Sequence, residues 1–114
     1  MPHRRQILGA TGEAAVAEWY RGQGYEVVAT NWRCRQGEID LVVRKGRVLV
    51  FCEVKTRTTT EFGLPAEAVT RDKRDRLRAL AARYLHDAPF RARELRFDVA
   101  AVLDGEIEII EGCF

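Results

Sequence analysis

A chain of 114 residues, 46% of them hydrophobic, is long enough to close one core and too short for two domains of ordinary size. Apolar runs such as residues 48–52 are far shorter than the roughly 20 residues of a membrane-spanning helix. The N-terminal residues lack the compact apolar segment and cleavage site of a secretory signal. These features predict a single domain over residues 1–114 that is cytoplasmic and has no membrane partner.

Cysteine usage and charge exclude some classes of protein and leave others open. Cys34, Cys52 and Cys113 form no Cys-x-x-Cys pair and only two histidines accompany them, which argues against a disulfide framework and a zinc site. The net charge is +2, but four of the 17 acidic residues follow residue 103, where no basic residue occurs. The chain before them is therefore moderately basic, which is compatible with an ordinary solvated surface and with a nucleic-acid partner.

The first predicted elements are a helix, a strand and a turn. Apolar residues recur at helical spacing over residues 9–23, where Gly22 and Gly24 supply a stop. Residues 25–30 are rich in strand formers, and a polar turn is expected over residues 31–37. The stripe of this helix that should face the sheet consists of Ala10, Ala14, Ala17 and Tyr20.

Two β-rich runs, residues 38–44 and 48–55, flank Gly46, which can adopt the positive φ of a tight turn and so predicts an antiparallel hairpin. After a polar segment, Pro65 can begin a second helix. Residues 95–103 and 106–110 resemble two further strands around an Asp104-Gly105 turn. The predicted fold class is α/β, a mixed sheet flanked by helices in the order αβββαββ. The buried stripe of the second helix would be Leu77, Leu80, Ala81 and Tyr84.

The expected hairpin register brings charged side chains together. A two-residue turn at Gly46 and Arg47 pairs residues whose numbers sum to 93, so that Asp40 faces Glu53 and Glu38 faces Lys55. The period of two then places these four side chains on one face of the hairpin. The other face should be buried and carries Ile39, Leu41, Val43, Val48, Val50, Cys52 and Val54.

Three neighbouring carboxylates repel one another unless a cation lies between them. Lys55 offsets one charge, and the remaining oxygen ligands suit a hard cation such as Mg²⁺. The alternative is a surface arrangement in which Glu38 pairs with Lys55 and Asp40 caps a turn, because an Asp followed later by Glu-x-Lys is a short and common pattern.

Glu13 adds a fourth carboxylate. It lies four residues before Ala17 and seven before Tyr20, on the stripe of the first helix that should pack toward the sheet. Because a carboxylate is rarely buried without a partner, Glu13 either forms a structural ion pair with an arginine or belongs to the same metal-centred cluster.

These motifs together resemble a known family. The segments are GE at residues 12–13, NWRCRQGEIDLV at 31–42, VFCEVKTR at 50–57 and RFDV at 96–99. They resemble the YraN-like bacterial proteins, which are counted as endonuclease-like, and the likeness spans nearly the whole chain. That family is similar to the Holliday-junction resolvase branch of the PD-(D/E)XK superfamily, which implies a restriction-endonuclease-like sheet. The superfamily's Pro before the Asp is replaced here by Ile39.

The resemblance implies a set of roles. The catalytic residues would be Glu13, Asp40, Glu53 and Lys55, with Asp40, Glu53 and Glu13 as ligands of Mg²⁺ or Mn²⁺. Lys55 would orient the attacking water or stabilise the transition state. Glu38 is either an extra ligand or a partner that tunes Lys55.

The second helix offers a basic surface for a polyanionic substrate. Lys73 falls at the edge of the buried stripe and is expected to point toward the site, whereas a solvated face is the alternative for the other basic residues. Trp32 is either a platform for a base or, more simply, a lid on the core. The candidate nucleic-acid contacts are Arg71, Lys73, Arg74, Arg76 and Arg78.

Two functions of different classes follow. One is a metal-dependent endonuclease that hydrolyses phosphodiester bonds in DNA, with branched DNA in recombination or repair as one substrate. The other is a nuclease-like fold that serves as a nucleic-acid or protein interaction module without turnover. Symmetric cutting of two strands would favour a homodimer.

Overall fold

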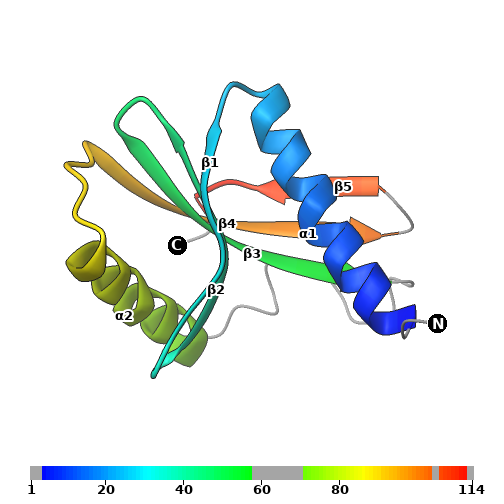
Figure 1. Ribbon diagram of the computed structural model, residues 1–114, viewed down its shortest axis with the longest axis horizontal. Coiled ribbons are helices and arrows are strands. Elements are labelled where there is room, and N and C mark those ends of the chain that lie inside the picture. Colours follow the sequence, from blue (N-terminus) through cyan, green and yellow to red (C-terminus); the bar gives the residue numbers. More distant parts are fainter. Residues whose placement is uncertain (1–3, 58–70, 104–105, 113–114) are drawn as a thin grey trace.

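The computed structural model describes residues 4–57, 71–103 and 106–112, with side chains described for residues 12–56, 71–103 and 106–112. The elements follow the predicted order αβββαββ (Figure 1). They are α1 (Arg4–Gly22), β1 (Glu26–Cys34), β2 (Gly37–Lys45), β3 (Val48–Arg57), α2 (Arg71–Asp87), β4 (Glu94–Leu103) and β5 (Glu106–Ile110).

The strands form one mixed sheet in the order β1-β2-β3-β4-β5. β1, β2 and β3 are antiparallel neighbours, β3 and β4 are parallel, and β4 and β5 are antiparallel. The parallel pair requires a crossover, and α2 lies within that connection. The predicted α/β fold with helices flanking a mixed sheet is therefore confirmed.

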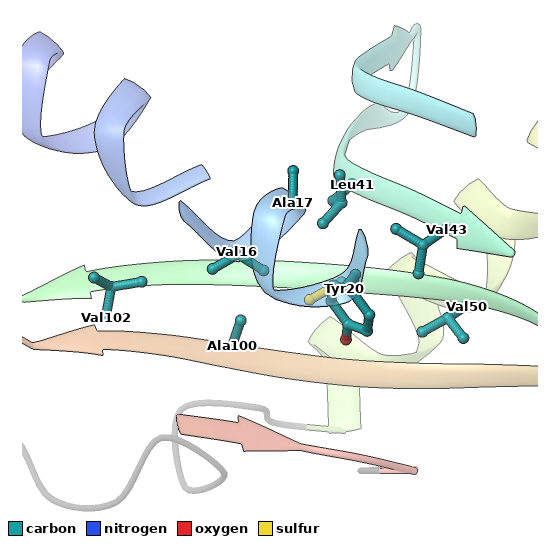
Figure 2. Packing of buried hydrophobic residues seen from close by; sticks show 9 residues of the cluster. Val16, Ala17, Tyr20, Leu41, Val43, Val50, Ala100 and Val102 are labelled. Carbon is teal, nitrogen blue, oxygen red and sulfur yellow. The ribbon is translucent and has the colours of Figure 1, made fainter. Parts of the chain in front are cut away.

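One core lies between α1 and the sheet. Tyr20 and Val16 of α1 are fully buried, and they face side chains of β2, β3 and β4 (Figure 2). Cys52 is buried in this core as the reduced hydrophobic residue that its strand pattern predicted. The remaining buried members are Ala17, Leu41, Val43, Val50, Ala100 and Val102.

A second core lies between α2 and the sheet. The predicted stripe of α2 is confirmed, because Leu80, Ala81 and Tyr84 are buried and Leu77 packs beside them. Trp32 packs edge-on against Tyr84, with ring centroids 5.5 Å apart, and so serves as a lid on this core. The sheet residues of this core are Ile39, Val42, Leu49, Phe51 and Phe97.

Three local predictions were wrong and two lie outside the described residues. α1 begins at Arg4 rather than at residue 9, and Ala14 is exposed rather than part of the buried stripe. β1 continues to Cys34 through most of the expected polar turn. An edge strand tolerates these polar side chains because its backbone still pairs with β2. The expected helix start at residue 65 and the turn at 104–105 are not described. In the described part of the chain, neither helix is long and apolar enough to cross a membrane.

The predicted register of the β2–β3 hairpin is confirmed from the turn as far as the Leu41–Cys52 pair. Pairs from Lys45–Val48 to Leu41–Cys52 obey the predicted sum, around a turn in which Gly46 has φ 59°. Before Leu41 the alternation of faces breaks, because Ile39 lies in the α2-side core and Leu41 in the α1-side core. On β1, Asn31 faces this break with a left-handed φ of 49°. The prediction that Ile39 lies on the same face of the hairpin as Leu41 was therefore wrong, although Ile39 is buried as expected, and the break falls at Asp40.

Candidate functional site

Gly12 sets the position of Glu13. A Cβ on the buried Gly12 would overlap the Oγ1 atom of Thr56 on β3, so the absence of a side chain lets α1 approach the sheet closely at this point. Glu13 follows directly and is half-buried. The helix thereby delivers a carboxylate to the end of the β2–β3 hairpin that lies away from its turn.

Three carboxylates from two elements converge there. One oxygen each from Glu13 of α1 and from Glu38 and Asp40 of β2 lie within 4.8 Å of one another. All three side chains are half-buried, so the group is partly shielded and still reachable from solvent. We call these three residues the acidic cluster. The expected convergence of Glu13 with Asp40 is present in the structure.

Asp40 lies at the centre of the charge in this region. Burial, together with the neighbouring carboxylates of Glu13, Glu38 and Glu53, raises the pKa of Asp40 above its ordinary value. The backbone N–H of Val54 donates a hydrogen bond of 2.9 Å to Asp40 Oδ2 and partly opposes that shift. A cation bound beside Asp40 would relieve the repulsion between these carboxylates.

Glu53 lies in a second group with two lysines. Its Oε1 atom forms ion pairs with Lys55 Nζ, at 3.2 Å, and with Lys73 Nζ of α2. Its Oε2 atom is buried and has no hydrogen-bond partner among the described residues. A carboxylate oxygen in that condition carries an uncompensated desolvation cost.

The two lysines beside Glu53 differ in their electrostatics. Burial lowers the pKa of Lys73, and the neighbouring Lys55 lowers it further, although Glu53 opposes both effects. Burial also lowers the pKa of Lys55, but its contacts with Lys73 and Glu53 outweigh that effect and leave the pKa raised. Lys55 therefore remains the firmly charged member of the pair.

A hollow of about 270 Å³ connects the two groups. Its charged lining residues are Glu38 and Asp40 of β2, Glu53 of β3, and Lys73 and Arg76 of α2. The break in β2 explains how Asp40 can contact Glu13 of α1 and also line a hollow under α2. This hollow has acidic and basic walls, as a site for a metal ion and a phosphate requires.

The structure corrects two details of the predicted constellation. Glu38 pairs with Arg33 of β1, at 3.1 Å, rather than with Lys55. The Asp40–Glu53 pair is not part of the backbone ladder, which ends at Leu41–Cys52. Both differences arise from the break at Asp40, which turns the start of β2 away from the register of the hairpin.

The candidate contacts on α2 divide into two sets. Lys73 points to Glu53, as its place at the edge of the apolar stripe predicted, and Arg76 is exposed while lining the hollow. The other three are exposed and lie outside the hollow's lining: Arg71, Arg74 and Arg78.

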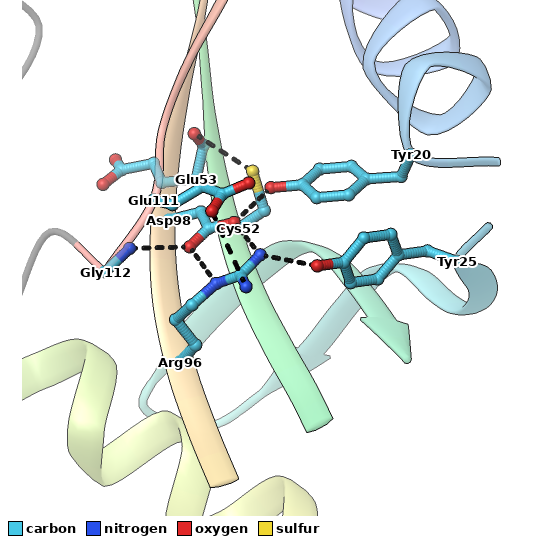
Figure 3. A network of polar contacts seen from close by, with 8 residues as sticks. All are labelled: Tyr20, Tyr25, Cys52, Glu53, Arg96, Asp98, Glu111 and Gly112. Carbon is cyan, nitrogen blue, oxygen red and sulfur yellow. Dashed lines mark hydrogen bonds and ion pairs between the residues drawn. The ribbon is translucent and has the colours of Figure 1, made fainter. Parts of the chain in front are cut away.

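A buried polar network around Asp98 of β4 carries no predicted role, although it belongs to the RFDV motif. Asp98 is 1% exposed and accepts hydrogen bonds from Tyr20 Oη at 2.6 Å, Arg96 Nε at 2.9 Å and Gly112 N at 3.0 Å (Figure 3). Arg96 also donates to Tyr25 Oη at 3.0 Å. A lone Asp within an apolar strand run is the sequence signal that predicts such a network.

Comparison with known proteins places the chain in a family. Residues 12–102 match the model described as "Uncharacterised protein family UPF0102". A UPF0102 protein of Beutenbergia cavernae is 54% identical over 87% of this chain and 84% of its own length. A UPF0102 protein of Moorella thermoacetica is 45% identical over the whole of both chains. The match begins at Gly12 and covers the acidic cluster, the Glu53 group and Asp98, so the chain belongs to the UPF0102 family.

Proposed function

We propose that this protein is a metal-dependent endonuclease that hydrolyses phosphodiester bonds in DNA. The observation that carries the proposal is the convergence of Glu13, Glu38 and Asp40 at a hollow that Glu38, Asp40, Glu53 and Lys73 line, with Lys55 paired to Glu53. Carboxylates that bind a divalent cation next to an ammonium group that faces a phosphate are the minimum chemistry of phosphodiester hydrolysis. The likeness of these residues to the PD-(D/E)XK nucleases supports the same conclusion.

The residues fit Mg²⁺ or Mn²⁺. All donors of the acidic cluster are carboxylate oxygens, which are the ligands that a hard cation selects. A cation would offset the repulsion that contributes to the raised pKa of Asp40, and it would give the buried Oε2 atom of Glu53 a partner. Asp40 and Glu13 would hold the ion beside Glu38, and Glu53, which lies outside the acidic cluster, would supply a further oxygen through Oε2.

When bound, such an ion polarises the scissile phosphate and lowers the pKa of an attacking water. The protein's own contribution is orientation and charge. Glu53 holds Lys55 and Lys73 through one oxygen, so Lys73 lines the hollow and Lys55 is fixed beside Glu53, which also lines it. Lys55, which stays protonated, would stabilise negative charge on the phosphate, while Arg76 would position a neighbouring phosphate.

DNA is the substrate that we propose, since Arg71, Arg74 and Arg78 are exposed on the same helix as Lys73 and Arg76, which line the hollow. Neutralising several phosphates with such side chains releases counterions, so binding should weaken steeply as salt rises. Affinity that stayed constant between low and moderate salt would count against this surface. A homodimer would present two hollows for cuts in two strands.

The test is a cleavage assay with Mg²⁺ or Mn²⁺ on branched, duplex and single-stranded DNA, with a chelator as the negative control. Glu53→Gln and Asp40→Asn should each reduce turnover by about a thousandfold or more, because each removes a charge that holds the metal. DNA binding should stay intact or become slightly tighter, since the hollow loses a negative charge that repels phosphate. Glu18→Gln, an exposed residue of α1 that pairs with Arg21, is the matched control and should cleave at the normal rate.

Thermal melting of each variant separates loss of chemistry from loss of fold. If Glu53→Gln cleaved as fast as the parent protein at the same metal concentration, Glu53 would be structural. An absence of metal-dependent products from every DNA, together with intact DNA binding, would favour the interaction module.

A further inference from the structure

A second hollow, of about 480 Å³, borders the turn between β2 and β3. This turn lies at the end of the hairpin opposite to the acidic cluster, because Asp40 is near the start of β2 and Lys45 is its last residue. Four basic residues line the hollow, Arg44, Lys45, Arg47 and Arg91, against one acidic residue, Glu26. The proposed chemistry at the acidic cluster leaves this basic surface unused.

Internal contacts already hold two of the four basic residues. Arg44 forms an ion pair with Glu26 and lies 5.0 Å from the centre of the Phe90 ring. Lys45 Nζ donates a hydrogen bond of 2.9 Å to the Gln23 carbonyl oxygen. These contacts fix the walls of the hollow and neutralise its one carboxylate.

The other two basic residues are available to a ligand. Arg47 and Arg91 are exposed and make no ion pair with any described residue. The backbones that carry them are joined, because the Arg93 N–H donates a hydrogen bond of 2.8 Å to the Arg47 carbonyl oxygen. Two guanidinium groups on a fixed frame, facing a hollow without a free carboxylate, suit an anion with several acceptor oxygens.

α2 connects this hollow to the acidic cluster. Lys73 and Arg76, near its start, line the first hollow, and the chain that follows its end carries Phe90 and Arg91 into the second. The five-residue step from Asp40 to Lys45 spans roughly 17 Å at the rise of a β-strand. One strand of duplex DNA carries a phosphate about every 3.4 Å along the helix axis, so a duplex lying along β2 spans both hollows within about five base pairs.

We infer that the second hollow is a phosphate-binding site, in which Arg47 and Arg91 contact the backbone of duplex DNA about five base pairs from the bond at the acidic cluster. The inference rests on the proposed function in taking DNA as the ligand, and it adds a length requirement. A strand of two nucleotides placed at the acidic cluster is too short to reach Arg47 and Arg91, whereas a duplex of 20 base pairs reaches both.

The test compares binding by fluorescence anisotropy, with Ca²⁺ in place of Mg²⁺, to a 20-base-pair duplex and a two-nucleotide strand. Arg47→Gln combined with Arg91→Gln should bind the duplex about tenfold more weakly or worse, and the salt slope should fall by roughly 1.8, or about 0.9 for each lost phosphate contact. Arg21→Gln combined with Arg83→Gln is the matched control, because it removes two exposed arginines that are held by Glu18 and Asp87. The control should bind the duplex as the parent protein does, and all three proteins should bind the short strand equally.

Equal duplex binding by the two double variants would overturn the inference, as would an equal loss of affinity for the short strand. Cleavage is scored separately on the parent protein. Selective loss of duplex binding without any cleavage would retain the second site and reject the nuclease. Cleavage by the parent protein, together with equal duplex binding by the two double variants, would retain the nuclease and reject the second site.

Discussion

Asp98 and Glu53 are two largely buried carboxylates in adjacent parallel strands, and they differ in how their oxygens are satisfied. Both oxygens of Asp98 accept hydrogen bonds, and Arg96 neutralises the charge with contacts of 2.9 and 3.0 Å. Glu53 uses one oxygen for two lysines, and its buried Oε2 has no partner among the described residues. A closed network of the first kind stabilises a fold, whereas an open one of the second kind is suited to a ligand.

The largest expected effect on stability comes from applying the same chemical change to both residues. Asp98→Asn should lower the free energy of unfolding by about 3–5 kcal/mol, because it leaves the guanidinium of Arg96 largely buried without its counter-charge. Glu53→Gln should cost about 1 kcal/mol, since the amide oxygen can still accept from the partly exposed lysines. Urea denaturation measures the free energy of unfolding of both variants. Equal losses would show that the two carboxylates contribute equally to stability and would contradict the comparison.

A smaller effect tests how closely α1 must approach the acidic cluster. Gly12→Ala should destabilise the protein by about 1–3 kcal/mol, because the added methyl group overlaps Thr56 Oγ1. Thr56→Ala in the same chain should restore most of that loss by removing the overlapping atom. Gly22→Ala is the control, since a Cβ there meets no atom within 4 Å, and it should leave stability unchanged or slightly raised.

Additive losses in the Gly12→Ala and Thr56→Ala double variant would contradict the packing explanation. Metal affinity, measured by titration calorimetry, should follow stability in the same series, because any shift of α1 displaces Glu13 from Glu38 and Asp40.

The smallest effect concerns the charge of Asp40 in metal-free protein. The folded protein raises the pKa of Asp40, chiefly through burial and then through Glu13, Glu38 and Glu53. The folded state therefore binds a proton at Asp40 more tightly than the unfolded chain does. Stability from this residue is therefore present at low pH and is lost as pH rises from the ordinary Asp pKa through the raised one. Asp40→Asn should melt a few degrees higher than the parent protein at pH 7, and the advantage should vanish below pH 3.8, the ordinary value.

Melting curves in the presence of a chelator check this pH dependence. Asp87→Asn, at an exposed ion pair with Arg83, provides the comparison and should show no such gain at neutral pH. A gain from Asp40→Asn that was equal at all pH values would mean that packing, rather than charge, limits stability at the acidic cluster.

The local order of the chain could be predicted from the sequence because hydrophobic period and turn chemistry are properties of neighbouring residues. The alternation on either side of Gly46 predicted the hairpin and its register correctly from Lys45–Val48 to Leu41–Cys52. The stripe on α2 predicted the residues that it buries. The motifs were sufficient to identify the family, and they included every residue of the acidic cluster and of the Asp98–Arg96 pair.

Tertiary structure decided how most of the charged groups pair. The break at Asp40 separates Glu38 from Lys55, and α2 instead brings Lys73 to Glu53 across a gap of 20 positions in the sequence. Tyr20 reaches Asp98 across 78 positions. Such contacts depend on where each helix settles on the sheet, and that placement follows from the packing of whole faces, including the close approach that Gly12 permits. Periodicity within a segment does not specify the relative positions of distant segments, because those are fixed only when the shared core closes.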